Sequence, residues 1–479
     1  MKGFVPTPKK TVDLMVDRLF FHKAPKPDDY LLDPGCGTGV FIEGVLRWCE
    51  TRGVKPPRIV GIESDRRHIP EIQDRFEGCS SVEIRCEDFL ENIPGSFDFI
   101  IGNPPYVPIT GLSKKEKHRY RREFATATGR FDLYLLFFEQ SLRALRTGGR
   151  LVFITPEKFL YVETAKALRL LLSRIRVEEI RLVHEATFGG LITYPTITTA
   201  TNRPPDDETE VVLRDGTEKR CRFPTDGGSW LPDIHGRPPL SHGTTLEQIC
   251  VRVSCGVATG ADEVFVRDPS ELDRALRAFT FPTIAGRDLD PQSPNLRSSR
   301  VMLVPYSKDG RLLPEHRLGV LGKYLTSANR REQLVKRTCV ERKPWYAFHE
   351  TPPLAEILRP KILCKDIAAR PHFWIDNDGS MLPRHSVYYI VPNDPYTLGE
   401  LCAYLNSDPV HRWLRAHCQR AANGFLRLQS RILKQLPIPF ELLSKSTCDD
   451  LVASRHRRNG IVTKRRKLDS STPMFEFAR

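Results

Sequence analysis

Asp33-Pro34-Gly35-Cys36-Gly37-Thr38-Gly39 is the stretch that decides the fold, because it lies between an apolar segment and an amphipathic one. The apolar segment, 30–33, predicts a strand, and 40–52 predicts a helix. Glycines in such a turn let the backbone take positive φ angles and approach a ligand closely. The amino end of the following helix favours a negatively charged group. The stretch therefore predicts a strand–loop–helix unit that binds a ligand.

Four more apolar segments, each a candidate strand, follow the glycine-rich stretch. They lie at 58–63, 82–85, 97–102 and 151–154. An amphipathic pattern over 131–146, ended by Gly148-Gly149, predicts a long helix before the last of them. Strands that alternate with helices predict a mostly parallel α/β sheet, and such sheets bind ligands at the carboxyl ends of their strands.

The pattern changes after about residue 200. Residues 202–210 are polar and hold two prolines, which predicts a loop, and 232–244 has the Pro, Gly and His content of a linker. Beyond it, strand and helix signals without a clear βαβ repeat indicate an α+β domain. We therefore expect an α/β domain at 1–240, an α+β domain at 245–440, and a basic, partly flexible tail at 441–479.

The composition is that of a globular protein with a basic surface, at 40% hydrophobic residues, 28% charged residues and a net charge of +14 over 479 residues. No apolar run approaches the roughly 20 residues that cross a bilayer, and the first residues lack a signal-peptide core. We therefore expect a cytoplasmic protein with no membrane partner. The 12 cysteines include no Cys-x-x-Cys pair, so we expect no metal site. The positive charge favours an acidic partner, of which nucleic acid is the commonest.

Acidic residues follow the second and third predicted strands. Glu63 stands at the end of the second strand, where an acid can hold ribose hydroxyls. Asp88, after the third strand, is placed to accept a hydrogen bond from a purine amine, and Phe89 can stack on that ring. The glycine pattern is Asp-x-Gly-x-Gly-x-Gly rather than the Gly-x-Gly-x-x-Gly of nicotinamide enzymes. Together these features indicate a nucleoside-type ligand other than a nicotinamide cofactor.

Asn103-Pro104-Pro105-Tyr106 directly follows the fourth predicted strand. The two prolines fix φ and remove two amide donors, which leaves carbonyl oxygens as acceptors, and the side-chain oxygen of Asn103 is another acceptor. Two acceptors that hold the two hydrogens of an exocyclic amine would aim its lone pair at a methyl donor and stabilise the positive charge that develops on nitrogen. Tyr106 can stack on a planar ring. The turn predicts a catalytic site for methylation of such an amine.

The order of these motifs resembles that of the gamma-class N6-adenine DNA methyltransferases of the TaqI-like type. Further stretches that carry the resemblance are Phe4-Val5-Pro6-Thr7-Pro8, Gly129-Arg130-Phe131-Asp132-Leu133-Tyr134 and Ala186-Thr187-Phe188-Gly189-Gly190. The resemblance implies a Rossmann-like methyltransferase domain, a C-terminal target recognition domain, S-adenosylmethionine as cofactor, and a target adenine flipped out of duplex DNA.

The resemblance also implies roles for individual residues. Tyr106 and Phe188 would stack on the flipped base, which offsets part of the cost of flipping. Asn103, Pro104, Pro105 and Tyr106 would form the catalytic clamp. The residues implied in cofactor binding are Thr7, Pro8, Asp33, Gly35, Gly37, Gly39, Glu63, Asp88 and Phe89.

Basic side chains suited to DNA lie in two regions. Residues 108–130, which include Lys114 and Lys115, are expected to form a mobile loop that faces phosphate. The second region, 411–434, contains no acid and lies in the part of the chain that resembles the target recognition domain. Phosphate contacts set affinity and salt dependence rather than sequence choice. Its predicted phosphate-binding residues are Arg412, Arg415, Arg427 and Arg431.

Other functions share some of these features. A methyltransferase that acts on RNA adenine, on cytosine N4 or on a protein glutamine uses related chemistry, and a DNA-binding subunit without activity is a further alternative. We expect a DNA adenine methyltransferase of a restriction–modification or defence system that acts on double-stranded DNA. No nuclease pattern of the Pro-Asp…Asp/Glu-x-Lys kind was found in the sequence, so any restriction endonuclease would be a separate partner.

Overall fold

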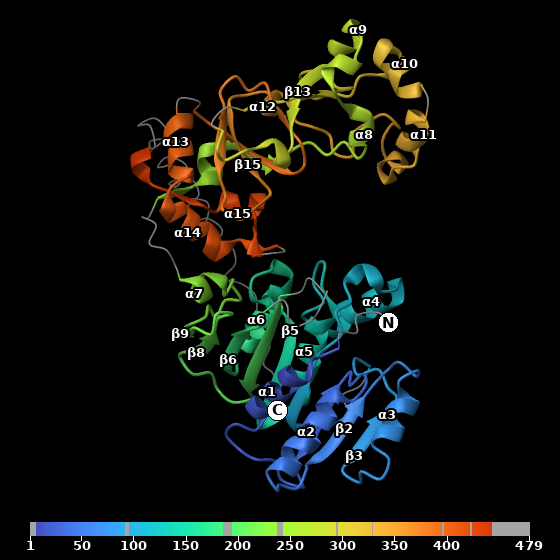
Figure 1. Cartoon of the computed structure of the whole chain (residues 1–479), viewed down its shortest axis with the longest axis vertical. Coiled ribbons are helices and arrows are strands. Elements are labelled where there is room, and N and C mark those ends of the chain that lie inside the picture. The colour runs from blue at the N-terminus through green and yellow to red at the C-terminus, as the bar shows by residue number, and fades with distance from the viewer. Residues whose placement is uncertain are drawn as a thin grey trace, which may run out of the picture. The chain divides into compact units, whose positions relative to one another are not determined.

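The computed structural model describes residues 6–91, 95–184, 194–236, 243–293, 296–327, 329–394, 397–421 and 424–442. The chain forms two compact units, Met1–Gly236 and Arg237–Arg479 (Figure 1). Within the described ranges, no helix combines the length and the apolar character needed to span a membrane.

A nine-stranded sheet is the centre of the N-terminal unit, with the order β3-β2-β1-β4-β5-β7-β6-β8-β9. The five strands from β3 to β5 are parallel, and β7 runs antiparallel to both of its neighbours. The chain steps outward from β1 to β3 and then returns to the other side of β1 with β4, so the ligand crevice of an α/β sheet is expected between β1 and β4. The strands are β1 Tyr30–Pro34, β2 Arg58–Ile62, β3 Val82–Arg85, β4 Phe97–Gly102, β5 Leu145–Pro156, β6 Arg176–Leu182, β7 Pro195–Thr201, β8 Thr209–Val212 and β9 Glu218–Cys221.

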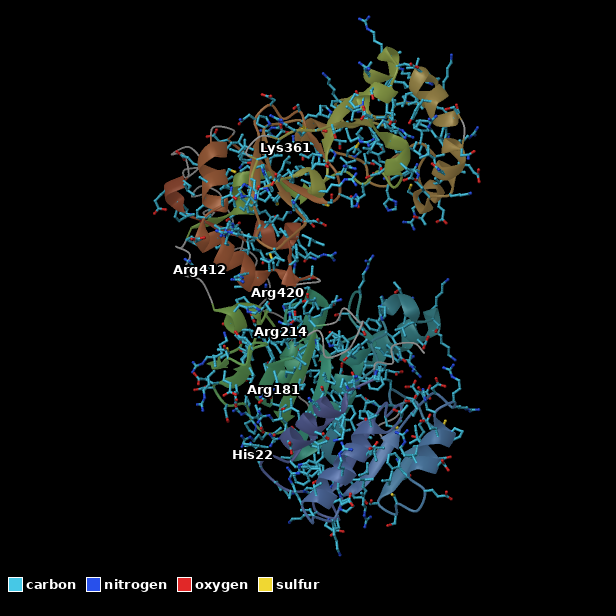
Figure 2. The ribbon with its side chains drawn as sticks, viewed as in Figure 1. His22, Arg181, Arg214, Lys361, Arg412 and Arg420 are labelled. Carbon is cyan, nitrogen blue, oxygen red and sulfur yellow. The ribbon has the colours of Figure 1, made fainter. Side chains whose placement is uncertain are left out.

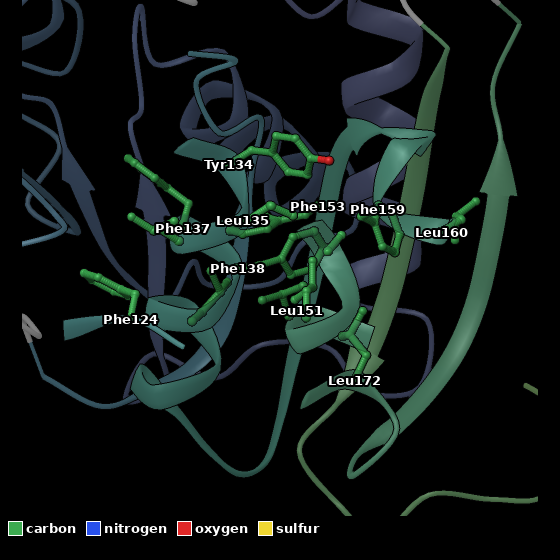
Figure 3. Packing of buried hydrophobic residues seen from close by; sticks show 14 of the residues in the cluster. Phe124, Tyr134, Leu135, Phe137, Phe138, Leu151, Phe153, Phe159, Leu160 and Leu172 are labelled. Atoms are coloured by element: carbon green, nitrogen blue, oxygen red, sulfur yellow. The ribbon is translucent and has the colours of Figure 1, made fainter. Parts of the chain in front are cut away.

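Helices cover both faces of this sheet, which explains why its central strands are apolar runs rather than alternating ones. Leu31 of β1 lies in a core with side chains of α1 and α2, whereas Leu32 lies in the core formed with α5 and α6. In the second core the rings of Phe138 and Phe153 are 5.1 Å apart, in an edge-to-face arrangement (Figure 3). The helices are α1 Lys9–Leu19, α2 Val40–Thr51, α3 Ile69–Arg75, α4 Lys114–Glu123, α5 Leu133–Ala144, α6 Lys166–Leu172 and α7 Leu231–His235.

Three local predictions were wrong. The helix expected over 131–146 ends at Ala144, and Gly148-Gly149 lies inside β5, where the positive φ of Gly148 (76°) lets its N–H bond to the Asn202 carbonyl at 2.7 Å. The region expected as a mobile loop, 108–130, contains a 3₁₀ turn, Ile109–Gly111, and the ten-residue helix α4. The first residues of the expected linker, 232–235, lie in helix α7.

The C-terminal unit is α+β, as the sequence predicts. Its described residues form two four-stranded sheets, β11-β19-β15-β17 and β12-β14-β13-β18, and two smaller ones, β10-β22 and β16-β21-β20. The strands are β10 Thr244–Thr245, β11 Cys250–Cys255, β12 Val266–Arg267, β13 Thr280–Ile284, β14 Arg300–Leu303, β15 Lys361–Lys365, β16 Ile367–Ala368, β17 Phe373–Asp376, β18 Leu382–Pro383, β19 Val387–Pro392, β20 Gln419–Arg420, β21 Leu426–Arg427 and β22 Pro437–Ile438. The helices are α8 Asp262–Phe265, α9 Arg274–Arg277, α10 Val320–Thr326, α11 Arg330–Val335, α12 Leu354–Ile357, α13 Leu398–Leu405, α14 Asp408–His417 and α15 Ser430–Lys434.

A buried ion pair stabilises the first of these sheets. Lys361 at the start of β15 contacts Asp376 at the end of β17, with 2.5 Å between Nζ and Oδ2 (Figure 2). Both side chains are almost fully buried, so neither charge could be removed alone without leaving the other uncompensated.

Candidate active site

A cavity of 460 Å³ opens at the carboxyl ends of the parallel strands of the N-terminal unit. This is the edge at which open α/β sheets bind ligands, and the volume is typical of a cofactor site. Segments far apart in sequence form its wall because their strands are neighbours in the sheet. Those after β1, β2, β3 and β4 contribute Gly35, Cys36, Thr38, Glu63, Ser64, Asp65, Asp88, Leu90, Asn103, Pro105 and Val107.

The loop after β1 requires its glycines. Gly35, Gly37 and Gly39 have φ angles of 76°, 56° and 78°, in the left-handed region that side chains disfavour. A Cβ on Gly39 would also lie 2.6 Å from the ring of Phe76. Gly35 lines the cavity, whereas Gly37 turns its N–H toward Glu63. The loop thus brings bare backbone to the wall of the cavity.

Glu63 is held by the backbone around it. Its Oε2 accepts from the N–H of Gly37 at 3.0 Å, and its Oε1 accepts from the N–H of Asp65 at 2.7 Å. Each carboxylate oxygen has two lone pairs, so both can accept a further hydrogen bond from a ligand in the cavity. The geometry suits an acid that binds a pair of hydroxyl groups.

Asp33, predicted to bind the cofactor, lies behind the glycine loop and does not line the cavity. It is fully buried, and neither carboxyl oxygen has a hydrogen-bond partner among the described residues. Burial raises its pKa well above the usual value, and the nearby Glu63 carboxylate raises it further. Asp33 is therefore buried away from the cavity wall rather than placed to contact a ligand directly.

Asp88 lines the cavity and already has two partners. Its Oδ1 accepts from the N–H of Leu90 at 3.0 Å, and its Oδ2 lies 3.1 Å from Nη2 of Arg119 on α4. The ring of Phe89, predicted to stack on the purine, is buried 5.3 Å from the ring of Phe137 and is not part of the wall. Leu90 and Phe137 line the cavity instead.

The turn after β4 places Asn103 at the wall, next to Thr7 from the N-terminal segment that precedes α1. Nδ2 of Asn103 donates to Oγ1 of Thr7 at 3.0 Å, and both residues line the cavity with Pro105. This contact joins positions 96 residues apart. Because the nitrogen of the amide bonds to Thr7, the orientation of the side-chain oxygen is also set.

Other residues of the predicted catalytic and cofactor set lie just outside the wall. Tyr106 is largely buried; its hydroxyl donates to the Ile154 carbonyl at 3.4 Å, and its ring meets that of Tyr134 edge to face at 6.2 Å. Pro104 is buried beneath the turn. Pro8 precedes α1, and its carbonyl accepts from the N–H of Thr11 at 2.9 Å, so its visible role is to start that helix. Phe188 lies outside the described residues.

Asp132 is a half-buried acid next to the catalytic turn that was not predicted as a site residue. Burial raises its pKa from 3.8 to about 6, and backbone N–H groups, including that of Val107, limit the rise. Its charge also contributes to a raised pKa of the Tyr106 hydroxyl. The stretch 129–134 was identified only through a family resemblance. The partial burial of Asp132 depends on tertiary packing, so the sequence alone did not reveal it.

Helix α4 forms a further part of the wall that the sequence did not reveal. Glu116 and Tyr120 line the cavity. Lys114 and Lys115, predicted to contact DNA, are exposed on the same helix. The signal that could have identified this helix is its capping box, in which the Ser113 side chain accepts from the N–H of Glu116 and the Glu116 carboxylate accepts from the N–H of Ser113.

The basic residues predicted in the C-terminal unit are all exposed: Arg412, Arg415, Arg427 and Arg431. Arg412 and Arg415 lie on α14, whose opposite face buries Val410, Trp413 and Leu414 (Figure 2). The exposed face is thus available for phosphate contacts. Among the described residues, no group of three or more ligating side chains could hold a metal ion.

Comparisons with known proteins agree with this geometry. Residues 62–188 match the family of Eco57I restriction-modification methylases, and 284–438 match the TaqI-like C-terminal specificity domain. The type II methyltransferase M.PaeR7I of Pseudomonas aeruginosa is 29% identical over 74% of this chain and 66% of its own length. M.BstVI of Geobacillus stearothermophilus is 25% identical over 92% of this chain and 90% of its own.

A solved structure shows the same fold. The type IIL restriction-modification enzyme MmeI, in complex with DNA, matches with a TM-score of 0.62 and 14% identity over 89% of this chain and 64% of MmeI. The chain thus spans about two thirds of the length of M.PaeR7I and of MmeI.

The sheet, the glycine loop and the family match together define a methyltransferase domain, which confirms the predicted α/β class. The chain contains an Eco57I-like restriction-modification methylase segment and a TaqI-like C-terminal specificity domain, and its relatives are type II methyltransferases. The family resemblance seen in the motifs is therefore confirmed.

Proposed function

We propose that this protein transfers a methyl group from S-adenosylmethionine to the exocyclic N6 amine of adenine in double-stranded DNA. The N-terminal unit would carry out the transfer, and the part at 245–440 would recognise the DNA site. The observation that carries the proposal is the Asn103–Thr7 hydrogen bond of 3.0 Å at the wall of the cavity.

The catalytic turn has the groups that an exocyclic amine requires. Thr7 holds the amide nitrogen of Asn103, which leaves the amide oxygen oriented as an acceptor. The carbonyl of Pro104 precedes a second proline and so belongs to a rigid segment. Two acceptors at this turn would align the amine for attack and stabilise the charge on its nitrogen, which is worth about 10²–10³ in rate for comparable groups. Tyr106 would stack on the flipped base.

The cavity would hold the nucleoside and amino-acid parts of S-adenosylmethionine, which when bound would supply the methyl group. Glu63 would accept from the two ribose hydroxyls, since both of its oxygens are fixed by backbone N–H groups. Asp88 would accept from the purine amine, and Leu90 and Phe137 give the ring an apolar wall. Thr7 would lie over the methionine part. The bare loop from Gly35 to Gly39 leaves room for close approach.

Duplex DNA as the target is supported by charge. The chain has a net charge of +14, and exposed basic side chains occur both on α4 and on α14. Such contacts would orient the duplex without reading its sequence. A separate restriction endonuclease would be the functional partner, and methylation would protect the recognised sites from it.

The test is to incubate the purified protein with radiolabelled S-adenosylmethionine and unmodified bacterial DNA, digest the DNA to nucleosides and separate them. We expect label in N6-methyladenine, at one sequence context when the sites are mapped by long-read sequencing. Label in N4-methylcytosine would refute the adenine assignment, and label in RNA or protein alone would refute DNA as substrate.

A further inference from the structure

Helix α4 has two faces with different surroundings. Glu116 and Tyr120 point to the cavity and line it. On the rest of the helix, Lys114, Lys115, His118, Arg121 and Arg122 are exposed. One short helix therefore forms part of the cofactor cavity and also presents a cationic surface to solvent.

Arg119 joins these two faces. Its Nη2 lies 3.1 Å from Oδ2 of Asp88, and its Nη1 lies 2.5 Å from Oε1 of Glu91. The guanidinium also lies 4.8 Å from the centre of the Tyr120 ring. The side chain of Arg119 is 25% exposed, so these ion pairs are screened less than fully exposed ones. Arg119 is thus the polar contact between α4 and the acid that faces the cofactor cavity.

Other contacts of α4 lie at Tyr120 and near the two ends of the helix. Tyr120 is the one buried side chain that the structure describes within this ten-residue helix. A helix of this length is marginal by itself and depends on its tertiary contacts. Its position therefore depends on the Arg119 ion pairs, on Tyr120, on the buried residues at its two ends, Leu112 and Phe124, and on Nη2 of Arg143, which donates to the Glu123 carbonyl at 3.0 Å.

We propose that Arg119 is a positioning residue that couples DNA binding to cofactor binding through helix α4. Phosphates that contact the exposed cations hold α4 against the unit, and Arg119 then fixes the Asp88 carboxylate toward the cavity. A cofactor that uses Asp88 stabilises the same arrangement from the other side. Because both ligands stabilise one element, each increases the affinity for the other by the same factor.

This inference rests on the proposed function for the identity of the two ligands, and it is tested by binding alone. The probe is S-adenosylhomocysteine, titrated calorimetrically with and without a saturating 25-base-pair duplex. In the native protein we expect the duplex to tighten binding about tenfold, within the usual range of coupling between sites. With Arg119→Gln we expect the duplex to change the affinity less than twofold.

Matched variants separate coupling from folding and from charge. Arg121→Gln removes the same charge from the exposed side of α4, so we expect weaker DNA binding and an unchanged tenfold coupling at saturating duplex. Glu91→Gln removes the charge of the other acid that pairs with Arg119 and keeps the Arg119–Asp88 pair. We therefore expect its coupling to lie between that of the native protein and that of Arg119→Gln. Arg119→Lys keeps the charge but not the two-pronged geometry, and we expect partial recovery.

Three outcomes would overturn the inference. The first is equal coupling in the native protein and Arg119→Gln. The second is an equal loss of S-adenosylhomocysteine affinity with and without DNA, as a merely structural residue would give. The third is a loss of coupling in Arg121→Gln as large as in Arg119→Gln. If the native protein methylates no adenine but its coupling depends on Arg119, the proposed function is refuted and the coupling is supported. If the protein methylates adenine but its coupling does not depend on Arg119, the function is supported and the coupling is refuted.

Discussion

Two hollows in the described part of the N-terminal unit lie at opposite ends of the strands of its sheet. The cavity of 460 Å³ opens at the carboxyl ends of the parallel strands. A cleft of 680 Å³ lies at the other end of the strands, and Arg150 of β5, Arg176 of β6 and Thr199 of β7 are among its lining residues. The cleft is the larger of the two, but its chemistry differs. Six arginines and six acids line it among the described residues.

The charges of the cleft neutralise one another. Arg150 lies 2.5 Å from Glu178, Arg18 lies 3.2 Å from Glu179, and other pairs follow around the rim. In the cavity, Glu63 is instead held by two backbone N–H groups, although Asp65 and Asp88 of the same wall pair with Arg67 and Arg119. Volume therefore does not distinguish a site from a structural cleft here. The distinction lies in polar groups that remain able to bind something else.

The largest expected effect comes from Asn103→Ala. Loss of the amide oxygen removes an acceptor that acts on the developing charge, so we expect the methyl-transfer rate to fall about 10²–10³-fold or more. Single-turnover transfer of labelled methyl groups measures it, and calorimetry with S-adenosylhomocysteine is the control. Cofactor affinity should stay within about threefold of the native value. A variant that loses cofactor affinity but transfers normally at saturation would show that Asn103 belongs to the cofactor site instead.

Arg150→Met tests the other side of the comparison. The side chains of Arg150 and Glu178 are 8% and 12% exposed, so removal of the arginine leaves a mostly buried carboxylate without its closest cation. We expect the free energy of unfolding to fall by about 3 kcal/mol, in the range measured for broken buried pairs. Urea unfolding measures this. The transfer rate at a temperature well below unfolding should match that of the native protein, and a loss of transfer at unchanged stability would make the cleft a functional site.

Local signals explain why the cavity could be located from the sequence. The glycine loop, Glu63 and Asn103-Pro104-Pro105-Tyr106 each follow a strand, and parallel strands bring their carboxyl ends to one edge. Glycine and proline report backbone geometry directly, so these turns are readable without knowledge of distant contacts. The side chains in the wall between them were less predictable.

The features of the site that the sequence did not predict depend on tertiary packing. Phe89 and Leu90 are adjacent in a turn without periodicity, so no pattern says which of them faces the cavity. The dense charge of α4 favoured a loop interpretation, although its capping box was present in the sequence. The Arg119–Asp88 pair joins positions that only the folded chain brings together. The cleft was not predicted at all, because its arginines and acids are scattered from Arg18 to Arg222.

Asp132 differs from the acids of the cleft because no arginine contributes to the shift of its pKa. The folded chain holds its pKa at about 6, against 3.8 in the absence of burial, so the native state binds this proton more tightly than the unfolded state does. Its contribution to the free energy of unfolding is therefore fully present below about pH 4 and is lost as the pH rises through about 6. The expected loss is about 3 kcal/mol. Asp132→Asn should unfold in urea with a weaker dependence on pH between 4 and 7, and an identical dependence would contradict the assignment.

The smallest expected effect, on Glu63→Gln, compares the two hollows directly. Both oxygens of Glu63 accept a backbone N–H, so a carboxamide would turn its NH₂ toward one of those donors and lose that hydrogen bond. The charge that strengthens hydrogen bonds to ribose hydroxyls would be lost as well. We expect the affinity for S-adenosylhomocysteine to fall about tenfold, which corresponds to about 1.4 kcal/mol.

Glu178→Gln is the matched control for that variant, because it makes the same chemical change in the cleft. Glu178 has Arg150, His22 and the Thr201 hydroxyl as partners rather than two backbone N–H groups. We expect Glu178→Gln to lower the urea midpoint and to leave the affinity for S-adenosylhomocysteine unchanged, whereas Glu63→Gln lowers the affinity. If both variants weakened binding equally, the cofactor site would be sensitive to the stability of the whole unit rather than to the carboxylate at the carboxyl end of β2. If neither did, Glu63 would serve only to fix the glycine loop.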